Sequence, residues 1–315
     1  MKNLKIAIAS GKGGTGKTTV AVNLHDALQP YLPAPILLVD CDVEAPNDLL
    51  FYPEATCMHQ SDVERLVPHI HTDRCTFCRK CSEYCAFNAL VVIPPAGFAE
   101  VNHELCHSCG ACKVACDFNA IEELPEKIGE IALYRDPANR QVMEGRLKIG
   151  SAMQTMVIKE LKKKARQSSS LLLFDSPPGT SCPVVTTLSD ADYVVLVTEP
   201  TPFGLYDLQL TVEMTRNMGK NFGVVINKAG LGNREVYDYL EHEKIEQLGE
   251  IPFDPAYAAN YACGNLRKDI PPQITRCYGE IAERLVRKIH GLQPQSPAPV
   301  DPHSSNETEN NTHPS

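Results

Sequence analysis

The chain contains no tryptophan, and only 6% of its 315 residues are aromatic. No stretch approaches the ~20 apolar residues of a membrane span, and the apolar run at residues 4–9 is too short for a secretory signal. The net charge of −9, without a basic cluster interleaved with aromatics, argues against a nucleic-acid binder. We therefore expect a cytoplasmic protein with no stable membrane insertion and no nucleic-acid partner.

Cysteine, in contrast, is abundant, with 13 in the chain. An odd number spread over a long chain disfavours a disulfide framework. In a reducing cytoplasm, clustered cysteines usually bind metal. The sequence therefore predicts metal ligands rather than disulfides.

Apolar runs alternate with helical patterns along most of the chain. This alternation predicts an α/β fold with a mostly parallel sheet that is covered by helices on both faces. The expected strands are residues 4–9, 36–39, 171–174, 193–198 and 222–226. The expected helices are residues 17–28, 153–166, 205–218, 234–247 and 273–290.

A cysteine-rich insert interrupts this pattern. It is an internal repeat, in which residues 74–90 match residues 105–121, and it holds two short expected strands at 90–93 and 98–101. We predict a discontinuous main domain of residues 1–69 and 122–292 and an inserted domain of residues 70–121. Residues 293–315 are rich in Pro, Ser, Asn and Thr, which predicts a disordered tail.

A glycine-rich stretch follows the first expected strand and opens a helix. It fits G-x-x-x-x-G-K-[ST], the P-loop motif, in the context that makes this motif specific. Backbone N–H groups of such a loop surround phosphates, the motif lysine reaches the β- and γ-phosphates, and the motif hydroxyl binds Mg²⁺. The predicted ATP/ADP-binding residues here are Gly11, Lys12, Gly13, Gly14, Thr15, Gly16, Lys17, Thr18 and Thr19.

Acidic residues follow two of the buried strands. Asp175 ends the strand at 171–174, an arrangement that holds the Mg²⁺ shell in P-loop proteins. Gly179, four residues later, is a candidate to sense the γ-phosphate through its N–H. Asp40 and Asp42 follow the strand at 36–39, where two carboxylates are also common as plain turn residues. Their position after a P-loop favours a role at the nucleotide.

The insert carries two runs with the spacing C-x₂-C-x₂-C-x₃-C. This is the spacing of bacterial ferredoxins with two [4Fe-4S] clusters, in which the fourth cysteine of each run binds the other cluster. Cluster one would take Cys75, Cys78, Cys81 and Cys116, and cluster two would take Cys106, Cys109, Cys112 and Cys85. Zinc is the alternative, since C-x₂-C pairs also bind zinc. The usual proline after the fourth cysteine is absent, because Ala86 and Asp117 stand there.

The motif GKGGTGKT at residues 11–18, with DCDVEAPN at 40–47 and DSPPGT at 175–180, resembles the MinD/Mrp/nitrogenase iron protein class of ATPases, here with an inserted two-cluster ferredoxin domain. The resemblance implies a dimer, either a homodimer or a heterodimer with a paralogue, in which Lys12 contacts nucleotide across the interface. It implies that Asp42 positions or deprotonates the attacking water and that Asp40 supports Mg²⁺ through water. It also places Asn227 at the adenine.

Three functions are compatible with these features. The first is an ATPase, slow without a partner, that couples nucleotide state to electron transfer or metallocofactor assembly with a redox or assembly partner protein. The second is an iron–sulfur cluster carrier of the Mrp type, although the C-x-x-C motif usual near the C-terminus of such carriers is replaced by the separated Cys263 and Cys277. The third is a spatial-organisation ATPase of the MinD or partition type.

Overall fold

The computed structural model describes residues 4–32, 35–167 and 171–292. Its centre is a nine-stranded sheet in the order β11-β10-β9-β1-β8-β2-β7-β6-β3. Neighbouring strands from β11 to β7 run parallel, whereas β7, β6 and β3 pair antiparallel. The strands are β1 (Leu4–Ala9), β2 (Ile36–Asp40), β3 (Thr56–Ile70), β6 (Ile121–Arg135), β7 (Gln141–Leu147), β8 (Leu171–Asp175), β9 (Tyr193–Thr198), β10 (Phe222–Ala229) and β11 (Gln247–Pro252).

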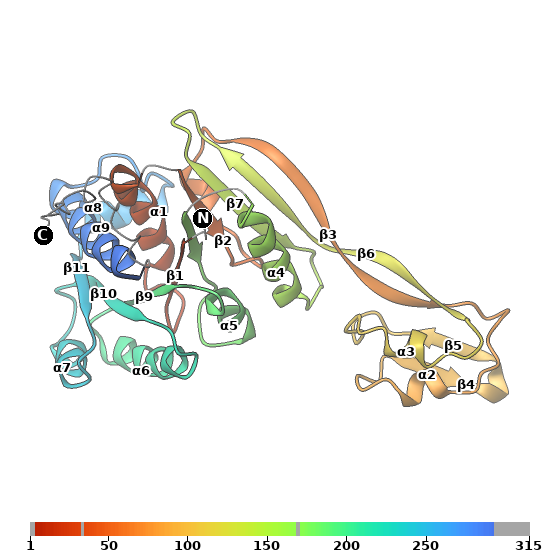
Figure 1. The fold of residues 1–315 in the computed structure, drawn as a ribbon. Coiled ribbons are helices and arrows are strands. Elements are labelled where there is room, and N and C mark those ends of the chain that lie inside the picture. Colours follow the sequence, from red (N-terminus) through yellow and green to blue (C-terminus); the bar gives the residue numbers. More distant parts are fainter. Residues whose placement is uncertain (1–3, 33–34, 168–170, 293–315) are drawn as a thin grey trace, which may run out of the picture.

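Helices cover both faces of the parallel part of the sheet (Figure 1). Helices α4, α5, α6 and α7 contribute to one apolar core, and α1, α8 and α9 contribute to a second core on the opposite face. The helices are α1 (Lys17–Leu28), α4 (Gln154–Ala165), α5 (Cys182–Leu188), α6 (Pro202–Asn217), α7 (Glu235–His242), α8 (Pro255–Ala262) and α9 (Pro272–Leu292).

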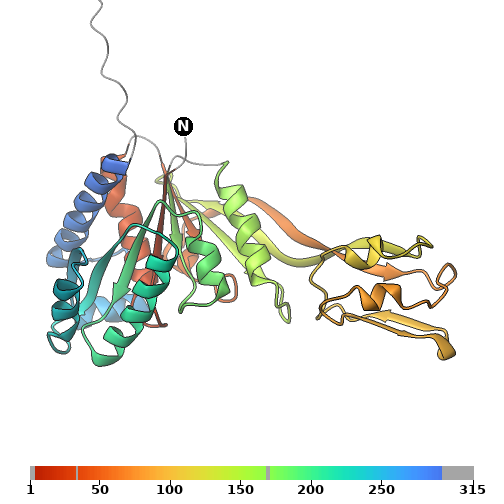
Figure 2. The same cartoon turned by 60° about the horizontal axis from the view of Figure 1, so that its bottom comes forward.

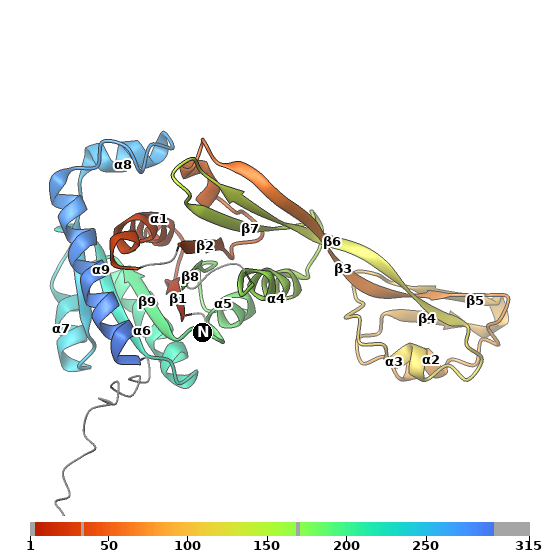
Figure 3. The same ribbon diagram turned by 45° about the horizontal axis from the view of Figure 1, so that its top comes forward.

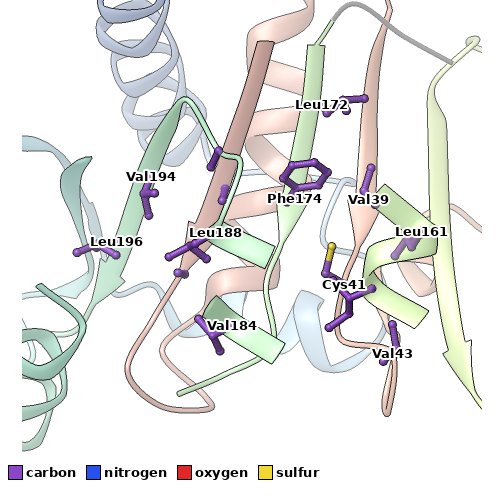
Figure 4. Close-up of a cluster of buried hydrophobic side chains, with 14 of the residues drawn as sticks. Val39, Cys41, Val43, Leu161, Leu172, Phe174, Val184, Leu188, Val194 and Leu196 are labelled. Atoms are coloured by element: carbon purple, nitrogen blue, oxygen red, sulfur yellow. The ribbon is translucent and has the colours of Figure 1, made fainter. Parts of the chain in front are cut away.

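The central strands are buried on both sides because their side chains alternate between the two cores. In β8, Leu172 and Phe174 point into the first core, while Leu171 and Leu173 belong to the second. Figure 4 shows Leu172 and Phe174 with Leu161 of α4 and Leu188 of α5 in the first core. Continuous apolar runs are therefore what this sheet requires, which is why the sequence located its strands.

The remaining strands form a long two-stranded ribbon that leads away from the body of the protein (Figures 1 and 3). β3 and β6 are 15 residues each and pair over their whole length. Only the Gly129–Arg135 part of β6 also pairs with β7, so the outer half of the ribbon has two strands. A register shift between Val63 and Glu64 lies near this transition.

The two cysteine runs lie beyond the outer end of the ribbon, well separated from the helices of the main sheet (Figure 2). Each run contains one short helix, α2 (Lys80–Glu83) or α3 (Ala111–Val114), and a two-stranded sheet of β4 (Leu90–Ile93) and β5 (Phe98–Val101) connects them. Val67, Ile70 and Ile121 of the ribbon pack in one apolar cluster with Leu90 and six of the eight cysteines of the two runs. We call residues 71–120 the cysteine module.

The structure confirms the α/β fold and every strand predicted from the sequence, as well as the short strands at 90–93 and 98–101. The helix expected at 234–247 was too long: α7 ends at His242, and β11 begins at Gln247. Lys244 between them has a φ of 53°, which a continuing helix does not allow. The predicted disordered tail, 293–315, lies outside the described residues.

Strands β3, β6 and β7 and helices α5 and α8 were not predicted. The ribbon is exposed along much of its length, so its strands lack the apolar runs of the central sheet, and β3 even contains Pro68. Among the described residues, no helix combines the length and the apolar character that crossing a membrane requires.

Candidate functional site

The P-loop joins β1 to α1, and its glycine Gly16 is tightly packed against Asn227. Gly16 directly precedes α1 with a φ of 94°, and a Cβ at this position would lie 2.2 Å from Nδ2 of Asn227. Only glycine fits there, because both the backbone conformation and the neighbouring side chain exclude a larger residue. Asn227 Nδ2 donates a hydrogen bond of 2.8 Å to the carbonyl of Thr15. The end of β10 therefore supports the P-loop directly.

A cavity of about 410 Å³ opens between the P-loop and the carboxyl ends of the strands. This is the position at which open α/β sheets bind ligands. Its lining includes the predicted Lys17, Thr18, Thr19, Asp42, Asp175 and Asn227. A further wall comes from Phe253 and from α8 and the residues after it, with Tyr257, Tyr261 and Leu266. The residue pattern did not reveal the last three.

Oxygen atoms suited to Mg²⁺ converge at the start of α1. Thr18 Oγ1 donates to Asp175 Oδ2 at 2.7 Å and lies 3.3 Å from Asn47 Oδ1. Burial raises the pKa of Asp175 to about 6, against the opposing effect of Lys17. Among the described residues, the other oxygen of Asp175 is buried and accepts no hydrogen bond from a backbone N–H or a hydroxyl group. Such a buried, partly unsatisfied carboxylate beside a hydroxyl fits a hard cation.

Asp48 is a member of this acidic group that sequence reasoning missed. It is fully buried, and its carboxyl group lies within hydrogen-bonding reach of the Asp175 carboxyl group. Burial, followed by the charges of Asp40 and Asp175, raises the pKa of Asp48 well above its ordinary value. An aspartate eight residues past a strand end carried no recognisable signal in the sequence.

Asp40 accepts hydrogen bonds from the backbone of the loop that follows it. Its two oxygens accept hydrogen bonds from the backbone N–H groups of Asp42 (3.0 Å), Asn47 (2.7 Å) and Asp48 (3.0 Å). Burial, and then the charge of Asp175, raises the pKa of Asp40, while these N–H groups oppose the shift. In this structure Asp40 holds the loop that carries Asp42; its contact with Mg²⁺ through water stays a prediction.

Lys12 is directed towards its own chain. Its Nζ lies 2.8 Å from Glu199 Oε1, 4.0 Å from Asp207 Oδ2 and 5.8 Å from the centre of the Phe203 ring. The second oxygen of Glu199 pairs with Lys228 at 3.0 Å. These ion pairs lower the pKa of Glu199 although burial alone would raise it. The single chain therefore places Lys12 against its own Glu199, and its contact with a nucleotide across a dimer interface stays a prediction.

The loop after β8 is tied to the P-loop strand. The N–H of Gly179 donates to the carbonyl of Ser10 at 3.0 Å, and the N–H of Ser176 donates to the carbonyl of Ile8 at 3.0 Å. The N–H expected to sense the γ-phosphate is thus already engaged. Sensing by Gly179 would first require its bond to Ser10 to break.

In the cysteine module, the two predicted quartets surround two separate small cavities. One cavity is lined by the cluster-one quartet, Cys75, Cys78, Cys81 and Cys116. The other is lined by the cluster-two quartet, Cys85, Cys106, Cys109 and Cys112. The structure therefore brings together the sets of four that the crossed spacing predicted, with the fourth cysteine of each run in the other run's cavity.

The backbone around both cavities follows one pattern. N–H groups two residues after Cys75 and Cys106 donate to those sulfurs at 3.4 Å, and N–H groups four residues after Cys85 and Cys116 donate at 3.3 and 3.4 Å. Positive φ angles recur at matching positions of the two copies: Phe77 and Ser108, Arg79 and Gly110, Asn88 and Asn119. These turns direct N–H groups at sulfur, which stabilises thiolates.

A site for a single metal ion would need several ligand side chains close together. Within the described ranges, no three or more His, Cys, Asp or Glu side chains gather closely enough to hold one metal ion. Of the other cysteines, Cys41 is buried, Cys277 is partly buried, and Cys57, Cys182 and Cys263 are exposed. Cys182 is the first residue of α5, in the segment that follows Asp175.

Comparison with solved structures identifies the same fold. The cell division ATPase MinD of Pyrococcus furiosus matches with a TM-score of 0.53 at 20% identity, over 91% of this chain and 99% of that chain. MinD of Pyrococcus horikoshii, solved with Mg-ADP, matches with a TM-score of 0.53 at 19% identity, over 93% of this chain and 100% of that chain.

Sequence comparison extends over most of the chain. An uncharacterized protein of Methanocaldococcus jannaschii is 32% identical over 286 residues, which are 90% of this chain and 96% of that protein. An iron-sulfur cluster carrier protein of Pyrococcus horikoshii is 25% identical over 310 residues, which are 92% of this chain and 88% of that protein. The CobQ/CobB/MinD/ParA nucleotide binding domain matches residues 6–266. Because this match spans most of the chain, the protein belongs to the CobQ/CobB/MinD/ParA nucleotide-binding family.

Proposed function

We propose that this protein is an ATPase that couples its nucleotide state, through the ribbon, to two [4Fe-4S] clusters in electron transfer or metallocofactor assembly. The observation that carries the proposal is the covalent and hydrogen-bonded continuity between the segment of Asp42 and the ribbon. A cysteine module attached by an unrelated loop would not be expected to respond to nucleotide.

Two connections make up this continuity. Along the chain, the loop after Asp42 runs through the short helix Asp48–Phe51 into β3. Across the sheet, Val43 accepts a 2.7 Å hydrogen bond from the N–H of Leu147 in β7, and β7 pairs with β6. A shift of the Asp42 segment on ATP binding would therefore act on both strands of the ribbon.

The ATPase half rests on the family and on the cavity. Lys17 would hold the phosphates of ATP, and Thr18 with Asp175 would hold Mg²⁺. Burial raises the pKa of Asp42, and Lys17 opposes that shift, so the carboxyl group is suited to orienting or accepting a proton from water. The overall reaction is ATP and water to ADP and phosphate. We expect it to be slow in the isolated protein.

The cluster half rests on the two cysteine cavities. The residues fit the group: each cavity has four cysteines on its lining, and N–H groups donate to the sulfur of two of them. Ligands of a cube bind four different irons and stand farther apart than ligands of one zinc ion, whose Zn–S bonds are ~2.3 Å. The two matched C-x₂-C-x₂-C-x₃-C runs favour the cube over zinc. When bound, each cluster would accept and release one electron.

A dimer would complete the ATP site. Lys12 lies at the start of the P-loop on an exposed face with Phe203 and Tyr206, which are 78% and 62% exposed. Two proteins of M. jannaschii both match most of this chain, at 32% and 28% identity. The dimer would be formed either by two copies or by this chain with such a paralogue, and a redox or assembly partner would meet the cysteine module.

The test compares the reduced protein with ADP and with a non-hydrolysable ATP analogue. We expect iron and sulfide for two clusters, and we expect the EPR spectrum or the midpoint potentials to differ between the two nucleotides. The Lys17→Ala variant should keep its iron and lose this difference. Clusters indifferent to nucleotide, with unchanged affinity for any partner, would refute the coupling.

The similarity to an iron-sulfur cluster carrier protein favours a second candidate, cluster delivery. In that case the clusters are cargo rather than resident groups. Incubation with an apo-ferredoxin separates the two functions: transfer of iron and sulfide within minutes supports a carrier, whereas two inert clusters support the proposal above. The third alternative, a spatial-organisation ATPase of the MinD or partition type, is supported by the fold alone.

A further inference from the structure

The ribbon contacts the two cysteine quartets differently, because the side chain of Arg65 is hydrogen-bonded to the backbone of the second quartet. Arg65 lies in the outer half of β3, and its side chain is only 6% exposed. Its NH1 donates to the carbonyl of Cys106 at 2.8 Å, and its NH2 donates to the carbonyl of His103 at 2.7 Å. A buried guanidinium of the ribbon is thus bonded directly to the backbone of a predicted cluster ligand.

The same side chain ties together both strands of the ribbon. Arg65 Nε and NH2 each lie 2.7 Å from Glu126 Oε2 in β6. His103 Nδ1 lies 3.1 Å from the other oxygen of Glu126. Arg65, Glu126 and the loop at residues 103–106 therefore form one closed network at the junction of ribbon and module.

Among the described residues, no arginine is recorded on the backbone of the first quartet in the way that Arg65 is bonded to Cys106, although Arg79 and Lys80 line the first cavity and Glu123 lines the second. Arg65 stands ten residues before Cys75, the first cysteine of the first run. The matching position, ten residues before Cys106 in the second run, is Ala96. Ala96 lies in the turn between β4 and β5 and carries no charge. The quartets also differ in burial, because Cys106 and Cys112 are buried whereas Cys75 and Cys81 are partly exposed. The backbone contact of Arg65 and the burial of two of its cysteines distinguish the second quartet.

We propose that Arg65 is a positioning residue for the second quartet, Cys85, Cys106, Cys109 and Cys112, and that its positive charge raises the reduction potential of the cluster held there. The inference rests on the proposed function, because it requires both clusters. Its physical basis is that an added electron makes a cluster more negative, and a nearby cation stabilises that charge.

Burial and charge act in opposite directions at this site. Removal of thiolate-bound iron from water disfavours additional negative charge, which lowers the potential. Glu126 is 28% exposed and better screened by solvent than Arg65, so the pair leaves a net positive field on the cluster side. Loss of Arg65 would therefore remove the charge that opposes the effect of burial. The reduction potential of cluster two would fall, and that of cluster one would not change.

The experiment is a reductive titration of the full-length, anaerobically reconstituted protein with dithionite, followed by EPR and without nucleotide. For Arg65→Gln we expect the potential of one cluster to fall and that of the other to stay unchanged. At a fixed potential, the ratio of reduced to oxidised cluster should fall by about tenfold, equivalent to ~59 mV for one electron. A Cys109→Ser variant, which alters the second quartet, identifies which of the two signals belongs to it.

Two further variants make the sign of the effect testable. Glu126→Gln removes the counter-charge and should raise the potential of the same cluster, which supplies an independent test if Arg65→Gln holds a single cluster. Lys127→Gln removes one positive charge from an exposed ribbon residue paired with Asp62 and should change neither potential.

The outcomes separate this inference from the function on which it rests. A protein that takes up no clusters refutes both. Two clusters with potentials that shift equally, or not at all, in Arg65→Gln and Glu126→Gln refute the role of Arg65 and leave the proposed function standing. A shift in cluster one alone would also overturn the assignment.

Discussion

Lys12 Nζ lies 2.8 Å from Oε1 of Glu199 in the same chain. Glu199 follows β9, and its other oxygen binds Lys228, whose Nζ also donates to the carbonyl of Gly14 at 2.8 Å. If Lys12 acts across a dimer interface, this ion pair must break first. In that case, the single chain holds Lys12 in a position that opposes dimer formation.

Glu199→Gln should favour the nucleotide-dependent dimer. A partly exposed ion pair contributes up to about 1 kcal/mol, so we expect the dimerisation constant with a non-hydrolysable ATP analogue to rise about two- to fivefold. Sedimentation velocity over a concentration series measures this. Lys12→Ala is the control and should prevent the dimer; a dimer unaffected by either change would contradict the role of Lys12.

Gly16→Ala should abolish nucleotide binding without unfolding the chain. The new Cβ meets Asn227 Nδ2 at 2.2 Å at a residue whose φ is 94°, and the strain costs about 1–3 kcal/mol of stability. Gly279→Ala is the matched control, because nothing lies within 4 Å of a Cβ added there, its φ is not positive, and it lies in α9, outside the lining of the P-loop cavity. Fluorescent ADP titration should separate the two variants; equal affinities would count against this P-loop geometry.

Cys85→Ala should damage the same cluster as Cys109→Ala, although the two residues come from different runs. Both line the second cavity, and neither lines the first. We expect each variant to lose about four of about eight irons and to retain one and the same EPR signal. Retention of different signals would show that each run binds its own cluster and that the crossed assignment is wrong.

Acidification should lower the free energy of unfolding because His25 is buried in its neutral form. Burial lowers the pKa of His25 from 6.5 to about 4, while its ring contacts the Tyr52 hydroxyl at 2.7 Å and the carbonyl of Ile36 at 3.1 Å. Below pH 6.5 the unfolded chain binds a proton that the folded chain refuses, so stability falls as the pH drops from 6.5 to about 4. At about pH 5 the loss amounts to about 2 kcal/mol.

Urea unfolding at about pH 7 and about pH 5 measures this effect. His25→Gln should be less stable than the parent at neutral pH, because one buried hydrogen bond is lost, but its further loss on acidification should be smaller by about 2 kcal/mol. Other titrating groups are common to both proteins and cancel in the comparison. The same pH dependence in both would exclude His25 as the source.

Motifs whose residues are close in sequence were predictable. The P-loop is a local turn, so the glycines, Lys17 and Thr18 could be recognised from spacing and flanks alone. Asp175 was found because a buried strand ends there, and the cysteine quartets were found because the ferredoxin spacing fixes which thiolates can share a cluster. The central strands were recognised because burial on both faces requires uninterrupted apolar runs.

The tertiary structure decided what depends on distant segments. Asp48 became part of the acidic group only because Asp40 folds the loop after β2 back by accepting three backbone hydrogen bonds. The ribbon was not predicted from the sequence because its strands are exposed along much of their length, so their buried apolar residues, such as Val63 and Val67, do not form continuous runs. Arg65 and Cys106 are 41 residues apart. They meet only because the cysteine module folds back against the outer end of β3.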